Sequence, residues 1–379
     1  MKENPRSKRN DKQTHRRNVL KSGAVGLSTL VVGSNLASAN EANSDQPARR
    51  GSTVYTAKGA RGASVSEEHR RQVRERAVSD FERKNGRSPE QLPASEHRSK
   101  SDEVVAYAYG IDANGTARSY TGIAGENTVE PEAQSGRAEA LIHDRFGGRV
   151  AELSRAVAAS ERQVTTMAGG TVSGTENMEQ AYSDKLEYAE DPYGVVGATF
   201  YWFRDNLDST EGDVHSFHSP AGFEPGHQAF GSGYTNNWGR VFNRWNKSQM
   251  GNTDVDYGQW NPYGTQGGSS TTAYSLSVNA GWMTAHVTAG ITWSYSQPNV
   301  EVVDESSAYN EYNQWQLKVN AGDDTRENFV GFQPSSAASM DYWDSSMGRR
   351  DICENEVKGQ FSDGGSARNL WSKGTFWLE

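Results

Sequence analysis

The chain has 379 residues, with 39 Lys and Arg against 48 Asp and Glu and a net charge of −9. This acidic balance disfavours nucleic acid and anionic membrane surfaces as partners, because both carry negative charge themselves. The single cysteine excludes a disulfide within the chain, so side-chain packing must hold the fold together.

Residues 1–39 have the features of a removable export signal. The twin arginines Arg16 and Arg17 precede a moderately apolar run that extends to Leu36, and the sequence Ala-Ser-Ala follows at 37–39. A basic start, a short apolar stretch and an A-x-A end are typical of signal peptides. The run is too short and too rich in Gly and Ser to anchor the protein in a bilayer.

This segment resembles a twin-arginine (Tat) signal, from whose pattern S/T-R-R-x-F-L-K only His15 and Val19 depart. The resemblance implies export of an already folded protein. Beyond residue 39 the chain has 31 Lys and Arg against 46 Asp and Glu, and only 8 of the 31 cations are Lys. Acidic, lysine-poor surfaces hold water in concentrated salt, which also screens their repulsion. Signal and composition together resemble a haloarchaeal secreted protein, and they imply an extracellular location.

Composition divides the remaining chain near residues 167–175. Residues 51–165 carry 17 cations, 17 anions and no tryptophan, whereas residues 166–379 carry 12 cations, 27 anions and all ten tryptophans. We therefore expect a disordered linker over 40–66, a small α+β unit over 67–165 and a mainly β domain over 166–379. The position of the first unit suits a propeptide, an intramolecular chaperone or an inhibitor, and equally a permanent N-terminal domain.

The expected elements of the first unit are two helices and a hairpin. The first helix places Val73, Ala77 and Phe81 on one stripe and ends at Gly86. A hairpin follows, with Asn114-Gly115 at its turn. A second helix carries one apolar face, made of Phe146, Val150, Leu153 and Val157.

The second unit has the two-residue period of β-strands. Odd positions from Met283 to Tyr295 are apolar, and the even positions between them are polar or small. The preceding run, 274–280, alternates in the same way. Such strands indicate antiparallel sheets with one wet face, as in a β-sandwich. We expect a helix over 175–190, before the first of these strands.

Residues 271–296 also resemble the stem segments of β-pore-forming toxins. Apolar and small polar residues alternate there over about ten residues per strand, which is the period of a membrane-crossing strand. The resemblance covers under a tenth of the chain, and it carries no family residue over to this sequence. It implies a secreted antagonistic or pore-forming protein, similar to a halocin in organisation, with a membrane as its target. Strands of a soluble sandwich have the same period.

The stretch DVHSFHSPAGFEPGH contains a candidate zinc site made of His215, His218 and His227, with Glu224 as the base of a metal-dependent hydrolase. Its Pro and Gly residues predict a loop. The alternative is a polar loop whose histidines cap turns or stack on aromatic rings. Residues 205–213 have the oxygen density of a calcium site, without the EF-hand spacing.

Aromatic rings among amide and carboxylate side chains are typical of glycan-binding surfaces, since rings stack on sugars while polar groups bind the hydroxyls. The candidate rings are Trp238, Tyr257, Trp260 and Tyr263. The alternative is that these rings form the core of the β domain. Asn114 and Asn246 begin sequons and are candidate N-glycosylation sites.

Three functions from different classes follow from these observations. The leading hypothesis is a non-catalytic module that binds a glycan or another cell-surface component. The second is a secreted pore-forming protein, and only this one needs a membrane as its partner. The third is a metal-dependent hydrolase that uses zinc.

Overall fold

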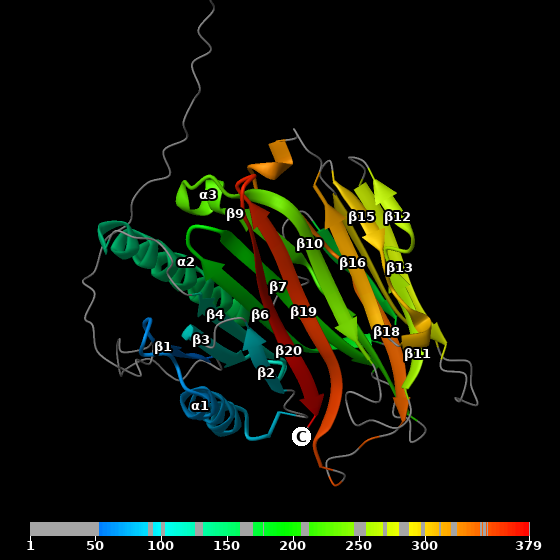
Figure 1. Ribbon diagram of the computed structural model, residues 1–379. Helices are drawn as coiled ribbons and strands as arrows, with labels where there is room; N and C mark the ends of the chain where they lie inside the picture. The colour runs from blue at the N-terminus through cyan, green and yellow to red at the C-terminus, as the bar shows by residue number, and fades with distance from the viewer. Residues whose placement is uncertain are drawn as a thin grey trace, which may run out of the picture. The chain divides into compact units, whose positions relative to one another are not determined.

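The computed structural model describes residues 53–89, 94–99, 103–125, 132–159, 170–176, 178–205, 212–245, 255–267, 271–279, 288–296, 300–310, 312–319, 324–341, 343, 346 and 348–378. All of them belong to one compact unit, Asn35–Glu379. Three separate β-sheets make up most of this unit, with helices at its periphery (Figure 1). The predicted fold class is confirmed: a mainly β, sandwich-like domain is preceded by a small α+β segment.

The first sheet has ten strands, and its pairs are antiparallel apart from the parallel pair β4–β6. In spatial order its main path is β1 (Thr53–Lys58), β3 (Val104–Ile111), β4 (Ala117–Ala124), β6 (Met178–Glu190), β7 (Gly194–Asp205), β8 (Gly212–His218), β18 (Ser335–Asp341) and β11 (Val255–Asn261). Off this path, β9 (Ala221–Pro225) pairs with β7 and with β17 (Val330–Phe332).

The second sheet has seven strands, and the third has three. The order of the second sheet is β12 (Thr265–Gly267), β15 (Glu301–Asp304), β16 (Tyr312–Lys318), β10 (Thr235–Arg244), β19 (Arg350–Ser362), β20 (Ala367–Leu378) and β2 (Ala94–Ser99). The third sheet has the order β13 (Thr271–Asn279), β14 (Thr288–Ser296) and β5 (Gly170–Glu176).

The first and second sheets pack face to face around large aromatic side chains. Phe217 of β8 lies at the centre, with ring centroids 5.7 Å from Trp202, 5.6 Å from Trp245 and 5.0 Å from Phe376. Alternate residues of each strand supply this layer, as the two-residue period predicts.

A pair of glycines lets the two sheets approach closely at one point. Gly239 and Gly359 are register partners on β10 and β19. A side chain at either position would collide with the ring of Phe223, which comes from β9 of the first sheet. The missing side chains leave room for this ring against the backbone of the second sheet.

The two long helices cover opposite faces of the β1–β3–β4 part of the first sheet (Figure 1). Helix α1 (Glu67–Asn85) starts at Ser66, whose hydroxyl accepts the N–H of His69, and ends at Gly86 with φ of 66°. Its buried residues Val73, Ala77 and Phe81 join the inter-sheet core. Helix α2 (Glu132–Ala159) packs Phe146 and Val157 on the other face. Both helices and the Asn114-Gly115 turn are confirmed.

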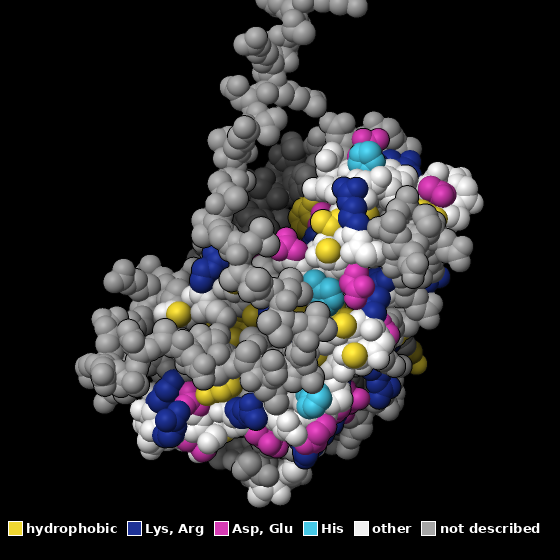
Figure 2. Space-filling model, turned by 90° about the vertical axis from the view of Figure 1, so that its left-hand side faces the viewer, with side chains coloured by type: hydrophobic (Ala, Val, Ile, Leu, Met, Phe, Trp, Pro, Cys, Tyr) yellow, Lys and Arg dark blue, Asp and Glu magenta, His cyan; other side chains and the backbone are white. Residues whose placement is uncertain are grey.

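The exposed face of α1 carries charges of both signs. Glu67 pairs with Arg70, and Glu68 with Arg71, one turn apart. Figure 2 shows dark-blue and magenta side chains interspersed on the face that it presents, without a large patch of one sign. No helix in the described part of the chain combines the length and hydropathy needed to cross a membrane.

The helix expected over 175–190 is wrong, because β6 occupies Met178–Glu190. The sequence misleads because polar residues fall on both faces of this strand. Asp184 and Glu187 are buried but satisfied by distant partners, Ser119 for Asp184 and Arg145 for Glu187. Pairing with β4 and β7 on either side outweighs local propensity.

The N-terminal and C-terminal segments share their sheets. β4 pairs with β6 across residues 167–175, and β2 extends the second sheet beside β20. β1 also falls in the stretch over which disorder is expected, 40–66, yet it pairs with β3 over six residues. Strands from both compositional units therefore build both main sheets.

We expect Phe217→Ala to lower the free energy of unfolding by about 3–5 kcal/mol, because it leaves a cavity among three buried rings. Phe329→Ala is the matched control, since Phe329 is 49% exposed and should cost much less. Chemical denaturation measures both. Equal losses in the two variants would contradict the central place of the inter-sheet rings.

Candidate functional site

The β13–β14 hairpin is an amphipathic element by sequence and register. Its ladder pairs Tyr274 with Trp293 and Leu276 with Ile291, so apolar positions stand opposite apolar positions. The intervening pairs, such as Ser275 with Thr292, join small polar positions. Because directly opposed residues of an antiparallel ladder share a face, the hairpin has one apolar and one polar register face. Of the alternating stretch from Met283 to Tyr295, β14 covers the part from Thr288 onward, and residues 280–287 lie outside the described residues.

The hairpin belongs to neither of the two main sheets. One of its strands, β14, pairs with β5, where Ser294 faces Thr171 and Trp293 faces Val172. The other strand, β13, contacts β11 and β18 at the end of the first sheet. β5 overlaps residues 167–175, where the composition divides the chain, so this junction supplies the strand that borders the hairpin.

The three candidate zinc ligands are not brought together. The expected loop is instead the strands β8 and β9, followed by the short helix α3 (Gly226–Phe230). His215 lies beside Trp202, whose indole N–H donates to its Nδ1 at 3.2 Å, and His218 stacks on Tyr201. Because Trp202 and Tyr201 are successive residues of β7, the two imidazoles lie on opposite faces of the sheet. His227 is half exposed on α3, 4.0 Å from Glu327.

The surroundings of His215 and His218 favour neutral rings. Burial lowers the pKa of both imidazoles, that of His218 to about 3. His218 Nδ1 lies 2.8 Å from the Ser335 hydroxyl, so it has a hydrogen-bond partner inside the sheet. Among the described residues, no group of three His, Cys, Asp or Glu side chains is arranged to hold a metal ion. Residues 206–211 of the candidate calcium segment lie outside the described residues.

Glu224, the expected base, is committed to an ion pair. Its Oε2 lies 2.5 Å from Nη1 of Arg145 on α2. Arg145 also contacts Glu187 of β6, and Arg149 lies 3.3 Å from Glu187 and 3.0 Å from Glu152. This network fastens α2 to the first sheet, and Glu224 belongs to it.

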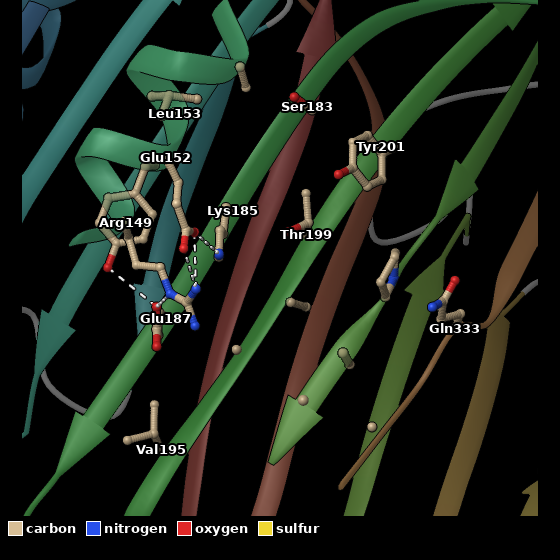
Figure 3. A pocket seen from close by; sticks show the side chains of 18 of the residues that line it. Arg149, Glu152, Leu153, Ser183, Lys185, Glu187, Val195, Thr199, Tyr201 and Gln333 are labelled. Atoms are coloured by element: carbon tan, nitrogen blue, oxygen red, sulfur yellow. Dashed lines mark hydrogen bonds and ion pairs between the residues drawn. The ribbon is translucent and has the colours of Figure 1, made fainter. Parts of the chain in front are cut away.

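A cavity of about 570 Å³ lies beside this network, between α2 and the outer face of the first sheet. Figure 3 shows Lys185, Thr199 and Tyr201 rising from neighbouring strands into it, with Arg149 and Glu152 descending from the helix. The volume is that of a small-molecule site. Sequence reasoning missed this cavity, because its lining comes from segments that were assigned to different units.

The aromatic candidates are placed in two sheets. Trp260 of β11 lies 5.6 Å from the Tyr263 ring, and its indole N–H donates to Asp304 at 2.8 Å. Tyr263 is 69% exposed, so the pair presents a ring to solvent. Trp238 lies on β10 of the second sheet, with Arg240 5.0 Å over its ring. Tyr257 pairs with Ala338 by its backbone, and its side chain lies outside the description.

One exposed ring was not anticipated. Tyr309 is 94% exposed in the short 3-10 helix Ala308–Asn310 after β15, where a lone tyrosine gives no sequence signal. Glycan stacking by the Trp260–Tyr263 pair stays a prediction. Asn114 is exposed at its hairpin turn, as a glycosylation acceptor must be, and Asn246 lies outside the described residues.

Comparisons with known proteins give structural likeness only. No protein-family model matches the chain, and no curated protein matches it. Among solved structures, Clostridium perfringens delta-toxin is similar with a TM-score of 0.31 and 10% sequence identity. The aligned region covers 57% of this chain and 96% of the delta-toxin chain. The NetB toxin of the same organism, in its membrane-inserted form, has a TM-score of 0.24 and 8% identity, covering 51% and 95%. TM-scores below 0.5 do not establish a shared fold.

Asp205, at the end of β7, makes the stability of the first sheet depend on pH. Its Oδ2 accepts the backbone N–H of Val214, while burial and nearby Asp213 raise the pKa of the Asp205 carboxyl to about 7. The folded state therefore holds this proton more tightly than the unfolded chain, whose Asp pKa is about 3.9. The resulting stabilisation is complete below about pH 4 and is lost as the pH rises through about 7.

We expect the free energy of unfolding to fall more between pH 4 and 7 in the unchanged protein than in Asp205→Asn. Denaturant titrations at several pH values measure this difference. The histidines contribute equally to the pH dependence of both proteins, so their contribution cancels in the comparison. Asp363→Asn is the control. Backbone N–H groups lower the pKa of exposed Asp363, so its contribution has the opposite sign. Parallel curves for Asp205→Asn and the unchanged protein would refute the raised pKa.

Proposed function

We propose that this protein is a secreted pore-forming protein whose β13–β14 hairpin enters the target membrane. The observation that carries the proposal is the register of the hairpin, which sets apolar positions against apolar positions in a sheet separate from the sandwich. A hairpin can leave such a position without breaking a ladder of either main sheet. We prefer pore formation to glycan binding, because the β13–β14 hairpin pairs with no strand of the two main sheets.

The dimensions suit a bilayer. Each strand has nine residues, and a transmembrane strand needs about 9–11. The face with Tyr274, Leu276 and Ile291 would meet lipid, and the face with Ser275 and Thr292 would line the water-filled side. Each backbone N–H and C=O must be paired in lipid, so hairpins from several copies of the chain would pair with one another.

Release from β5 is the step that exposes the hairpin. The β14–β5 ladder holds the outer edge of β14, which otherwise offers unpaired backbone groups to another strand. Breaking this ladder would free β14 for the hairpin of a second copy. Pairing with β5 therefore keeps the protein from assembling prematurely.

Export, habitat and processing are part of the proposal. The Tat-like signal and the acidic, lysine-poor composition support secretion into concentrated salt. The pairings β4–β6 and β2–β20 support an N-terminal segment that stays with the β domain, because its removal would uncover an edge in each main sheet.

The double variant Thr171→Cys/Ser294→Cys tests release from β5. These residues are register partners, and their Cα separation of about 4.5–5.5 Å lies within the range for a disulfide. We expect the unchanged protein and the reduced variant to release dye from vesicles, and the oxidised variant to release none. The single variant Ser294→Cys is the control for oxidation. Equal release by the oxidised and reduced forms would sink the proposal, as would a lack of release by the unchanged protein.

Charges placed on adjacent positions test which face meets lipid. An arginine at the centre of the lipid-facing side of a membrane strand costs about 2–4 kcal/mol. We therefore expect Ile291→Arg to reduce dye release at least about tenfold. Thr292→Arg, one position along the same strand, should retain it. The reverse order of the two variants would contradict the assigned faces, provided that circular dichroism shows both folded.

A further inference from the structure

A transverse row of small residues crosses the outer face of the first sheet. The register aligns one position from each of five strands, and together they are Gly122, Glu187, Gly197, Gly222 and Gly331. Four of the five positions lack a side chain. Glycine weakens a strand interior, so a row of four indicates a place where something approaches the backbone closely.

Rings from the chain itself fill this row on both sides of Gly197. A methyl group at Gly122 would lie 2.8 Å from the Phe146 ring, and one at Gly222 would lie 2.5 Å from the Phe329 ring. At Gly197 the atoms nearest to such a methyl group are the Leu186 carbonyl oxygen and the Glu187 stem, and not a ring. Gly197 therefore forms the open floor of the 570 Å³ cavity.

A second row, at the other end of the cavity, carries side chains that can donate hydrogen bonds. Arg118, Ser183 and Tyr201 form another transverse row on β4, β6 and β7, four residues along from the glycine row. At about 3.3 Å per residue the two rows are about 13 Å apart. Burial raises the pKa of Tyr201, so its phenol stays protonated and can donate a hydrogen bond. All three residues line the cavity.

The cavity lining has four cationic and three acidic side chains, and Arg118 is the cation whose ion-pair partner lies outside the lining. The lining acids Glu152, Glu187 and Glu224 are each ion-paired with Arg145, Arg149 or Lys185. Within the described residues, the ion-pair partner of Arg118 is Asp112, outside the lining, whose Oδ2 lies 3.7 Å from Nη2 of Arg118. The other carboxylate oxygen of Asp112, Oδ1, accepts the N–H groups of Asn114 and Thr116. The Arg118 side chain is 13% exposed, and within the described part of the protein its Nε has no hydrogen-bond partner.

We propose that this cavity binds a small amphiphile with one anionic group. Arg118, Ser183 and Tyr201 hold the carboxylate or phosphate head. The apolar body extends from the head toward Gly197, in a lining that includes Leu153 of α2 and Phe329. The same chemistry occurs in a free fatty acid and in a single-chain lipid phosphate. The site is independent of pore formation, because it can be filled in solution without a membrane.

Calorimetric titration of the purified protein with octanoate, octyl phosphate, 1-octanol and inorganic phosphate tests the proposal. We expect at least one of the two charged amphiphiles to bind about tenfold more tightly than 1-octanol, since hydrogen bonds to a charged group supply that difference. Inorganic phosphate should bind weakly, because it lacks the apolar body. The stronger of the two charged ligands identifies the head group, and so distinguishes a fatty acid from a lipid phosphate.

Two variants and a control assign the site. Arg118→Gln should abolish the preference for the charged amphiphile over 1-octanol, and Gly197→Val should weaken both by filling the floor. Arg71→Gln, on the exposed face of α1, should bind as the unchanged protein does. If Gly197→Val fails to fold, Arg118→Gln alone decides. Equal affinity for octanoate, octyl phosphate and 1-octanol, or affinities that Arg118→Gln leaves unchanged, would overturn the proposal.

Discussion

The packing of large rings between the first and second sheets is the interaction on which the rest of the structure depends. Trp202 and Phe217 come from the first sheet, Phe376 comes from the second, and Trp245 directly follows β10 of the second. Hydrophobic residues make up only 34% of the chain, so a few large rings must supply much of the buried apolar area. Each such ring buries about 150–250 Å². Both main sheets receive strands from the N-terminal segment, which this core therefore holds in place.

A rigid sandwich leaves the functional features at its periphery. The β13–β14 hairpin has its own small sheet, and the cavity lies on the outer face of the first sheet under α2. Neither contributes the rings of the inter-sheet core, so a hairpin that moves and a cavity that fills need not disturb it. The buried histidines instead belong to the sheet interior, where His215 and His218 are neutral and paired with neighbours.

Elements with a strong local signal could be predicted from the sequence. Helix α1 is predicted by the stripe of Val73, Ala77 and Phe81 and by Gly86 at its end. The β3–β4 hairpin is predicted by the turn residues Asn114 and Gly115. Both signals depend only on residues that are close in sequence. The alternation over 271–296 gives the hairpin strands in the same way. These signals depend on period and turn chemistry alone.

Features assembled from distant strands could not be predicted. β6 looks helical by itself, and only its pairing with β4 and β7 shows why buried Asp184 and Glu187 are tolerated. The glycine row needs the register of five strands, which no local pattern encodes. The Pro and Gly residues of the histidine stretch predict a loop. The stretch instead forms strands because it pairs with β7 and β18, which are distant in sequence or have no local signal.

The most direct test of the central claim is the distance between two nitroxide labels, one at Ser275 in β13 and one at Arg71 in α1. A Cys353→Ala background avoids the buried native thiol. Electron–electron resonance measures the distance distribution in solution and after the addition of vesicles. If the hairpin leaves the sandwich, the membrane-bound protein shows a new, longer distance while α1 stays folded. An unchanged distribution in protein that releases dye would show that the pore is formed by another part of the chain.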